Sequence, residues 1–142
     1  MESFFKSMNV AASGMTAERM RFNVITQNIA NAETTRTENG GPYVRKYVTF
    51  REILDSTFSD NDTNSFSGVQ VDSIEEDSAP FRLVYDPTHQ DADAEGYVRY
   101  PNVVALKEMV DMMNAQRAYD ANTAVISTAR SMFNSALNIG RQ

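Results

Sequence analysis

One stretch of the chain has the spacing of a calcium-binding loop. In DADAEGYVRYPN, which begins at Asp91, carboxylates occupy the first, third and fifth positions and a glycine the sixth, as in an EF-hand. The twelfth position of such a loop needs a bidentate glutamate, but here it is Asn102. Pro87 also interrupts the helix that should enter the loop. The sequence therefore argues against calcium here, and we expect no metal ligand and no cofactor.

The other titratable side chains do not form a catalytic set. His89, the only histidine, lies between Asp86 and Asp91, but zinc needs two or three more ligands than this neighbourhood supplies. The carboxylates at 75–77 could form a hydrolase acid pair, although a run of this kind before Pro80 is more typical of a solvated turn. No serine lies in a GxSxG context and no Gly-rich phosphate loop follows a predicted strand. We therefore predict no catalytic residue, no enzyme activity and no small-molecule substrate.

Charge and cysteine content exclude further classes. The net charge is −6, and the acidic excess lies in the middle of the chain, whereas the two ends are nearly neutral. No basic cluster is present, so nucleic acid is not an expected partner. The chain has no cysteine and therefore no disulfide and no thiolate metal site. It also has no apolar run long enough for a signal-peptide core or for the roughly 20 residues of a membrane span. By the usual routes such a chain stays in the cytoplasm.

The first element that the pattern predicts is a long helix within residues 1–33. Apolar residues fill seven of eight positions spaced alternately by four and three, which is a heptad seam typical of a coiled coil. Gly14 lies inside this helix and either admits a close neighbour or is tolerated at a cost of up to about 1 kcal/mol. The seam consists of Phe4, Met8, Ala11, Met15, Glu18, Phe22, Ile25 and Ile29.

A second long helix is expected within residues 102–142. Asn102 follows Pro101 and suits an N-cap, and Gly140 suits the stop at the other end. Its seam is rich in alanine and shifts phase near Arg117. The seam begins with Val103, Leu106, Val110 and Met113 and continues with Ala118, Ala121, Val125, Ala129, Met132, Ala136 and Ile139.

The middle, residues 34–101, is predicted to be β-rich. Residues 50–58 fit a helix or a strand, and Ser59–Gly68 has the composition of a mobile loop. The expected fold class is α+β, with two long terminal helices forming a coiled-coil-like axial domain and a small β-rich insertion between them. The predicted strands are Tyr43–Phe50, Val69–Ile74, Phe81–Tyr85 and Gly96–Tyr100.

The two seams favour self-assembly over a monomer. They could simply pack against each other, but two helices cover only one side of each other. Apolar residues outside the seams would then stay exposed, and exposed apolar surface on that scale usually marks an interface. The alternative is a soluble helical-hairpin adaptor that binds a single protein partner. The apolar residues outside the seams are Phe5, Met20, Met109, Met112 and Phe133.

Two motifs at opposite ends of the chain resemble the flagellar rod, hook and filament axial proteins. NVITQNIANAETT, from Asn23 to Thr35, resembles the Asn-rich N-terminal signature SxNxANxxT of that family. MVDMMNAQRAYDAN, from Met109 to Asn122, resembles its C-terminal signature A-x-R-x-Y-x-A-N. The stretches GPYVRK and VYDPTHQDADAEGYVRYPNV between them are similar to proximal rod proteins of the basal body. Gln90 and Val104 depart from that pattern, where proline and a polar residue are commoner.

The resemblance implies a structural subunit of the proximal rod. Its terminal helices would self-assemble into an inner tube, the axial drive shaft that carries torque from motor to hook, and its middle would face outward. The implied partners are other copies of the chain and other rod proteins, with the membrane-ring protein and the export apparatus as further candidates. The implied location is the periplasmic rod region of the flagellar basal body, reached through the type III export apparatus without a cleaved signal peptide.

In such a lattice we expect the seams and the amides near them to contact other subunits. Amides donate and accept hydrogen bonds without a charge that is costly to desolvate, and Arg117 and Tyr119 can each bridge apolar and polar groups. The alternative for the amides is exposure on a free helix end. The expected interface residues are Phe4, Met8, Ala11, Met15, Phe22, Ile25, Asn28, Ile29, Asn31, Val110, Met113, Arg117, Tyr119, Ala121, Asn122, Val125, Met132 and Ile139.

Overall fold

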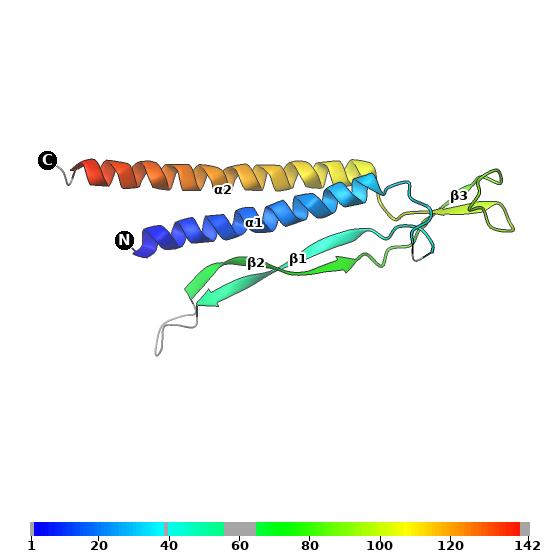
Figure 1. The fold of residues 1–142 in the computed structure, drawn as a ribbon, viewed down its shortest axis with the longest axis horizontal. Coiled ribbons are helices and arrows are strands. Elements are labelled where there is room, and N and C mark those ends of the chain that lie inside the picture. Colours follow the sequence, from blue (N-terminus) through cyan, green and yellow to red (C-terminus); the bar gives the residue numbers. More distant parts are fainter. Residues whose placement is uncertain (1, 39, 56–64, 140–142) are drawn as a thin grey trace.

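The chain folds into two long helices with two small antiparallel hairpins inserted between them. The structure, a computed structural model, describes residues 2–38, 40–55 and 65–139. This arrangement confirms the predicted α+β class (Figure 1). No helix within the described ranges is long and apolar enough to span a membrane. The elements are α1 (Glu2–Ala30), β1 (Lys46–Asp55), β2 (Ser65–Glu76), β3 (Arg82–Tyr85), β4 (Tyr97–Tyr100) and α2 (Ala105–Ile139).

Helix α1 forms the middle of three layers. Helices α1 and α2 lie side by side and run in opposite directions, so the start of α1 and the end of α2 lie toward the same end of the molecule (Figure 1). The β1–β2 hairpin lies along the other side of α1, and the β3–β4 hairpin projects beyond the opposite end of the helix pair (Figure 1). The hairpin therefore covers a face of α1 that a helix pair alone would leave open.

The two contacts of α1 explain its burial pattern. Ala11 and Ile25, which belong to the predicted seam, are buried, and so are Ala17 and Val24, which lie outside it. A helix that packs on both sides needs a wider apolar surface than a seam with two apolar positions in each heptad supplies.

The hairpin approaches α1 closely at Gly68. A Cβ at this position would lie 2.6 Å from Ser13 Oγ, which no real side chain could occupy without displacement. The backbone N–H of Val69 donates to the same Oγ at 3.1 Å. The backbone conformation of Gly68, with φ of 145°, also favours glycine. These features fix the position of β2 along α1.

The inward face of α2 coincides with its predicted seam only in part, at Ala129. Glu108, Ala115 and Ala129 are buried, and Asn122 is half-buried on the same side. The predicted seam residues Leu106 and Val110 are instead exposed, with 73% and 51% of their surface accessible. The inward face is built from small and polar side chains, so counting apolar residues selects the opposite face of the helix.

Gly14 of α1 admits a close neighbour from α2. A Cβ on Gly14 would lie 2.9 Å from Nδ2 and 3.3 Å from Cγ of Asn122. Of the two readings of this glycine, the structure supports the packing role. The short distance allows the two helices to approach closely at this level.

We expect Gly14→Leu to destabilise the chain by about 1–3 kcal/mol, because the added side chain would force the helices apart. Equilibrium urea unfolding measures the change. Combining Gly14→Leu with Asn122→Ala should recover part of the loss, and strictly additive effects of the two changes would contradict the proposed contact.

The β-rich middle differs from the predicted strands mainly at their ends. β1 and β2 pair from Lys46↔Glu76 to Asp55↔Ser65, with irregular register between Thr49 and Phe50 and between Ile53 and Leu54. The ambiguous stretch after Phe50 is a strand as far as Asp55. Of the expected mobile loop, residues 65–68 belong to β2 and the rest lies outside the described residues. β3 and β4 pair from Arg82↔Tyr100 to Tyr85↔Tyr97.

Candidate assembly interface

A buried polar junction holds the helices and the first hairpin together. The Asn28 side chain of α1 is 1% exposed, and all its hydrogen-bonding capacity is used. Its Nδ2 donates to the Lys46 carbonyl at 2.7 Å and to Glu108 Oε2 at 2.9 Å. Its Oδ1 accepts from the Lys46 N–H at 2.9 Å and from the Tyr43 hydroxyl at 3.0 Å. A buried amide satisfied in this way fixes the start of β1 against both helices.

Glu108 of α2 is the charged centre of this junction. It is fully buried, and Arg45 Nε donates to its Oε1 at 2.7 Å. The same guanidinium pairs with Asp77 at 3.3 Å and lies 3.8 Å from Asp111. Two carboxylates of α2 and one from the loop after β2 therefore share one largely buried cation.

Asn102 ties the connection before α2 to the same junction. Its Oδ1 accepts from the Arg45 N–H at 2.7 Å, and its Nδ2 donates to the carbonyls of Asp77 and Ala79 at 3.0 and 3.1 Å. The prediction of Asn102 as N-cap is wrong, because the first helical hydrogen bond of α2 runs from the Glu108 N–H to the Val104 carbonyl. The predicted stop at Gly140 lies outside the described residues.

The junction gives the side chain of Asn28 partners inside its own chain. Asn28 was expected to present its amide to other subunits, but the structure uses that amide wholly inside the chain. Sequence reasoning also missed the roles of Tyr43, Arg45 and Glu108 in this network. Their partners are far apart in the chain, and a polar network produces no hydrophobic period.

The junction predicts a loss of stability at alkaline pH. Burial, with the charges of Glu108 and Glu76, raises the pKa of Tyr43 above its ordinary value near 10. The folded state thus holds this proton to higher pH than the unfolded state. The stabilisation is complete below about pH 10 and is lost as the pH rises through the folded pKa.

Urea unfolding between pH 9 and 11 should therefore show stability that falls less steeply for Tyr43→Phe than for the unchanged chain. Tyr85→Phe, which removes the hydroxyl of an exposed tyrosine outside the junction, is the matched control. Equal slopes for all three proteins would contradict this role of Tyr43.

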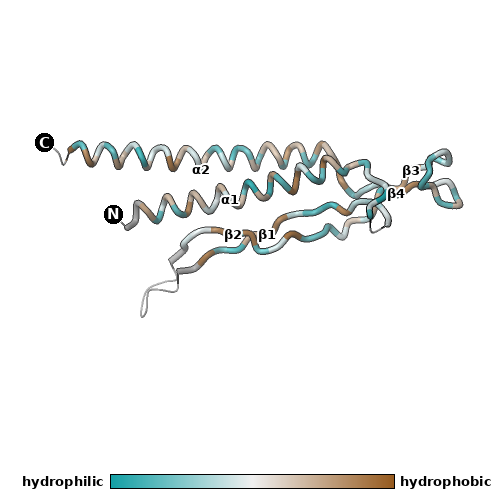
Figure 2. Tube along the Cα trace, viewed as in Figure 1, coloured by the Kyte–Doolittle hydropathy of each residue, from teal (hydrophilic) through white to brown (hydrophobic). Residues whose placement is uncertain are grey.

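A stripe of apolar residues that also contains Arg117 runs along the side of α2 that faces away from α1. Its residues recur mainly at spacings of three, four and seven and fall within about 120° of the helix circumference. All of them are exposed, and hydrophobic segments recur along the whole of α2 (Figure 2). We call this surface the outer stripe; it consists of Leu106, Val110, Met113, Arg117, Ala121, Val125, Met132 and Ile139.

The structure divides the expected interface residues into three groups. Those on α2 are mostly exposed, whereas those on α1 are mostly buried or half-buried. The side chain of Phe4 lies outside the description. Ala11, Ile25 and Asn28 are buried inside the chain. Met8, Met15, Ile29, Asn31 and Asn122 are half-buried, and Phe22, Val110, Met113, Arg117, Tyr119, Ala121, Val125, Met132 and Ile139 are exposed.

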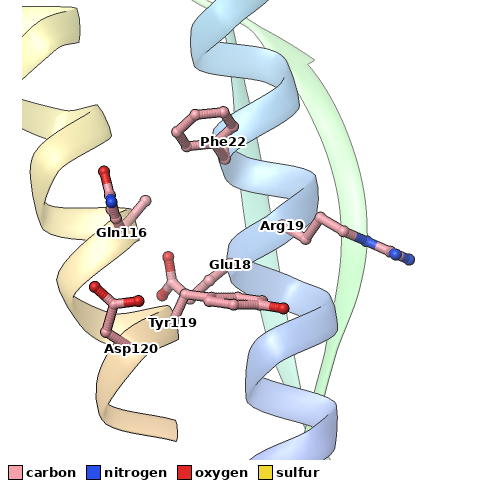
Figure 3. Close-up of a pocket in the computed structure, with 7 residues that line it drawn as sticks. Glu18, Arg19, Phe22, Gln116, Tyr119 and Asp120 are labelled. Atoms are coloured by element: carbon pink, nitrogen blue, oxygen red, sulfur yellow. The ribbon is translucent and has the colours of Figure 1, made fainter. Parts of the chain in front are cut away.

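A groove of about 420 Å³ opens between α1 and α2 (Figure 3). Phe22 and Tyr119 supply its aromatic surface, and Glu18 and Asp120 supply carboxylates. Arg19 also lines the groove, but its guanidinium points away from it (Figure 3). The groove therefore combines aromatic surface with negative charge.

The groups that resembled a calcium or acid–base site have local roles. Asp91 accepts from the Thr35 hydroxyl at 2.8 Å and lies 3.6 Å from Arg36. Asp93 accepts from the N–H groups of residues 95 and 97, which closes the turn before β4. His89 Nδ1 accepts from the Asp91 N–H at 3.1 Å. Within the described ranges, no group of three or more acidic, histidine or cysteine side chains is placed to hold a metal ion.

The β3–β4 hairpin carries a second exposed apolar surface that sequence reasoning did not identify. Leu83 and Tyr85 on β3 are 61% and 64% exposed, and Tyr97 on β4 is 41% exposed. Tyr85 and Tyr97 pack edge to face with ring centroids 5.3 Å apart. The alternation of apolar and polar residues along these short strands was the available signal for this surface. It does not show which face of the hairpin is covered by other parts of the chain.

Comparisons with known proteins agree with the two terminal motifs. A family model described as flagella basal body rod protein matches residues 8–36, and one described as flagellar basal body rod FlgEFG protein C-terminal matches residues 94–139. These ranges fall mainly on α1 and α2.

Full-length relatives cover nearly the whole chain. The flagellar basal-body rod protein FlgC of Borreliella burgdorferi is 46% identical, with 95% of this chain and 96% of the relative covered. FlgC of Bacillus subtilis is also 46% identical, covering 96% and 98%. FlgC of Salmonella typhimurium is 39% identical, covering 94% and 95%. All three names describe rod proteins rather than enzymes. Identity of this extent, over both helices and the middle between them, means that the chain belongs to the FlgC family of flagellar basal-body rod proteins.

Proposed function

We propose that this chain, a structural subunit of the flagellar basal-body rod, assembles through the outer surfaces of its two terminal helices. The function is mechanical, and the chain is not an enzyme. Family membership supports the rod role and gives the alternative of a soluble helical-hairpin adaptor no support. In the proposed rod the helices form the inner axial part and the β-rich middle faces outward.

The observation that carries this proposal is the outer stripe. Helix α2 presents two faces, and the described residues cover only one of them. The exposed face holds Val110, Met113 and Met132, which are 51%, 55% and 59% accessible. A stripe of this length left in water would be costly, and covering it with neighbouring subunits recovers roughly 25 cal/mol for each Å² of apolar surface.

The partners are other flagellar rod components, and we propose that these include further copies of this chain. The membrane-ring protein and the export apparatus are further proposed partners. We place the chain in the rod between the inner membrane and the cell wall, which it would reach through the flagellar type III export apparatus. A chain without cysteine forms no disulfide that would obstruct passage through a narrow channel.

The proposed mechanical role is the transmission of torque from motor to hook. Torque would be shared among many contacts along the stripe, so no single residue should act as a catalytic group does. The buried junction around Glu108 would hold the two helices and the first hairpin in fixed relation while the load passes through them.

An in-frame deletion of the gene in its own host tests this role. Electron microscopy of extracted basal bodies should show a membrane ring without rod, hook or filament, and the cells should not swim. The gene supplied in trans should restore both. Normal flagella in the deletion strain would overturn the proposal.

A further inference from the structure

The groove between α1 and α2 holds a carboxylate that lacks a hydrogen-bond donor. Glu18 Oε2 is buried and accepts no hydrogen bond from any described residue. Arg21 Nη1 is 3.8 Å from this oxygen, which is too far for a hydrogen bond. The other terminal nitrogen of Arg21, Nη2, lies 4.0 Å from Asp111. Leaving a buried carboxylate oxygen without a donor is unfavourable, and 18% of the Glu18 side chain stays exposed, so the carboxylate can accept a further cationic donor that enters the groove.

The surroundings of Glu18 select the type of cation. Figure 3 shows Glu18 beside Tyr119, with Phe22 one turn further along α1 and Asp120 at the rim. A guanidinium can stack on an aromatic ring and still donate to a carboxylate in its own plane, which an ammonium cannot do as well. The groove therefore fits an arginine side chain better than a lysine.

The outer stripe carries such a side chain. Arg117 is exposed, and no hydrogen bond or ion pair joins it to another residue within the described ranges. Its neighbours one turn away on the stripe are Met113 and Ala121, which would exclude water around the guanidinium once the stripe is covered.

The positions of groove and arginine suit side-by-side copies. Groove residues Ala115 and Asp120 bracket Arg117 along α2, so the two surfaces lie at the same level. They face different directions, because the two residues from Ala115 to Arg117 turn the helix by about 200°. One copy can thus insert Arg117 into a neighbour and receive another neighbour's arginine in its own groove.

From this geometry we propose that the α1–α2 groove receives Arg117 of a second copy of this chain. The contact joins two different surfaces and is not closed by a two-fold axis, so it propagates as a ring or an open helix. The inference rests on the proposed function and deepens it, since it names the pair of surfaces that meet.

Cross-linking tests the contact, because the chain has no native cysteine. Gln116→Cys reports the groove and Ala121→Cys reports the stripe, and both leave Arg117 and Glu18 unchanged. In one chain these positions lie on different sides of α2 and cannot form a disulfide with each other. Basal bodies from deletion cells complemented with the double variant are oxidised and examined by denaturing gel electrophoresis.

The contact predicts a ladder of covalent dimers and higher multimers for the double variant and none for either single variant. Adding Arg117→Ala should weaken the ladder about tenfold or more. A ladder unchanged by Arg117→Ala would overturn the role of the arginine. Dimers from Ala121→Cys alone would overturn the proposal in favour of stripes that face each other.

The remaining outcomes separate this inference from the rod function. Swimming cells whose double variant gives no ladder would show that something other than a second copy fills the groove, and the rod role would stand. If cells with the double variant do not swim, the purified double variant is oxidised at rising concentration instead. Covalent dimers would then support the contact between copies, and monomer alone would contradict it. Normal rods in the deletion strain would instead refute the proposed function itself.

Discussion

Replacing Arg45 by methionine should lower the free energy of unfolding by about 3–5 kcal/mol. Glu108 is fully buried, and Arg45 is the cation that donates to it, at 2.7 Å. Without the guanidinium, the Glu108 carboxylate would keep its hydrogen bond from Asn28 but would remain as an uncompensated charge. Asp77 and Asp111 would lose the same cation. Equilibrium urea unfolding followed by circular dichroism measures the loss.

Arg36→Met is the matched control, because Arg36 pairs with Asp91 at 3.6 Å while 76% of its side chain is exposed. This change should cost less than about 1 kcal/mol. Adding Glu108→Leu to Arg45→Met should recover part of the stability, since the unpaired charge is then removed. Similar losses for Arg45→Met and Arg36→Met would refute the junction as the main polar support of the fold.

Introducing charge into the outer stripe should abolish swimming without unfolding the chain. Met113 and Val125 are 55% and 47% exposed, so aspartate at both positions stays in water and should change stability by less than about 1 kcal/mol. In an assembled rod the same carboxylates would be desolvated against apolar neighbours, at a cost of several kcal/mol each. Complementation of the deletion strain, scored by swimming and by electron microscopy of basal bodies, gives the result.

Ser127→Asp controls for the added charge, because Ser127 is exposed on α2 but lies outside the outer stripe. Cells with this variant should swim. Full motility with the double stripe variant, or equal loss with Ser127→Asp, would count against assembly through the stripe.

The two helices were predictable because their apolar residues recur at helical spacing. Both long helices and the strand-rich middle followed from periodicity and from the placement of proline and glycine. The inward face of α2 was not predictable in this way. It consists largely of residues such as Ala115 and Asn122, whose small or polar side chains give a weak hydrophobic signal. The stronger signal came from the face that stays exposed in the single chain.

The junction could not be predicted for a different reason. Asn28 and Glu108 are far apart in sequence. The residue type alone also does not show whether an asparagine or a glutamate is buried or exposed. The prediction for the amides near the end of α1 concerned contacts with other subunits, whereas the structure gives Asn28 partners within its own chain. Its partners are Lys46 and Tyr43 of the same chain together with Glu108. Hydrophobic periodicity does not report polar contacts between residues that are far apart in sequence.

The structure thus separates two tasks along the same helices. Glu108 and its partners lie at one end of α2, where they set the relation between helices and hairpin. The outer stripe runs from Leu106 to Ile139 and makes no use of that network. A variant can therefore disturb assembly without disturbing the fold, which makes the stripe and junction variants complementary tests.

Cryo-electron microscopy of basal bodies that contain this chain tests most directly whether the terminal helices build the rod. The account predicts that α1 and α2 lie on the inside of the rod, that Val110, Met113 and Val125 are covered by neighbouring subunits, and that the β-rich middle faces outward. A reconstruction in which the outer stripe faces solvent, while copies meet only through the β hairpins, would contradict it.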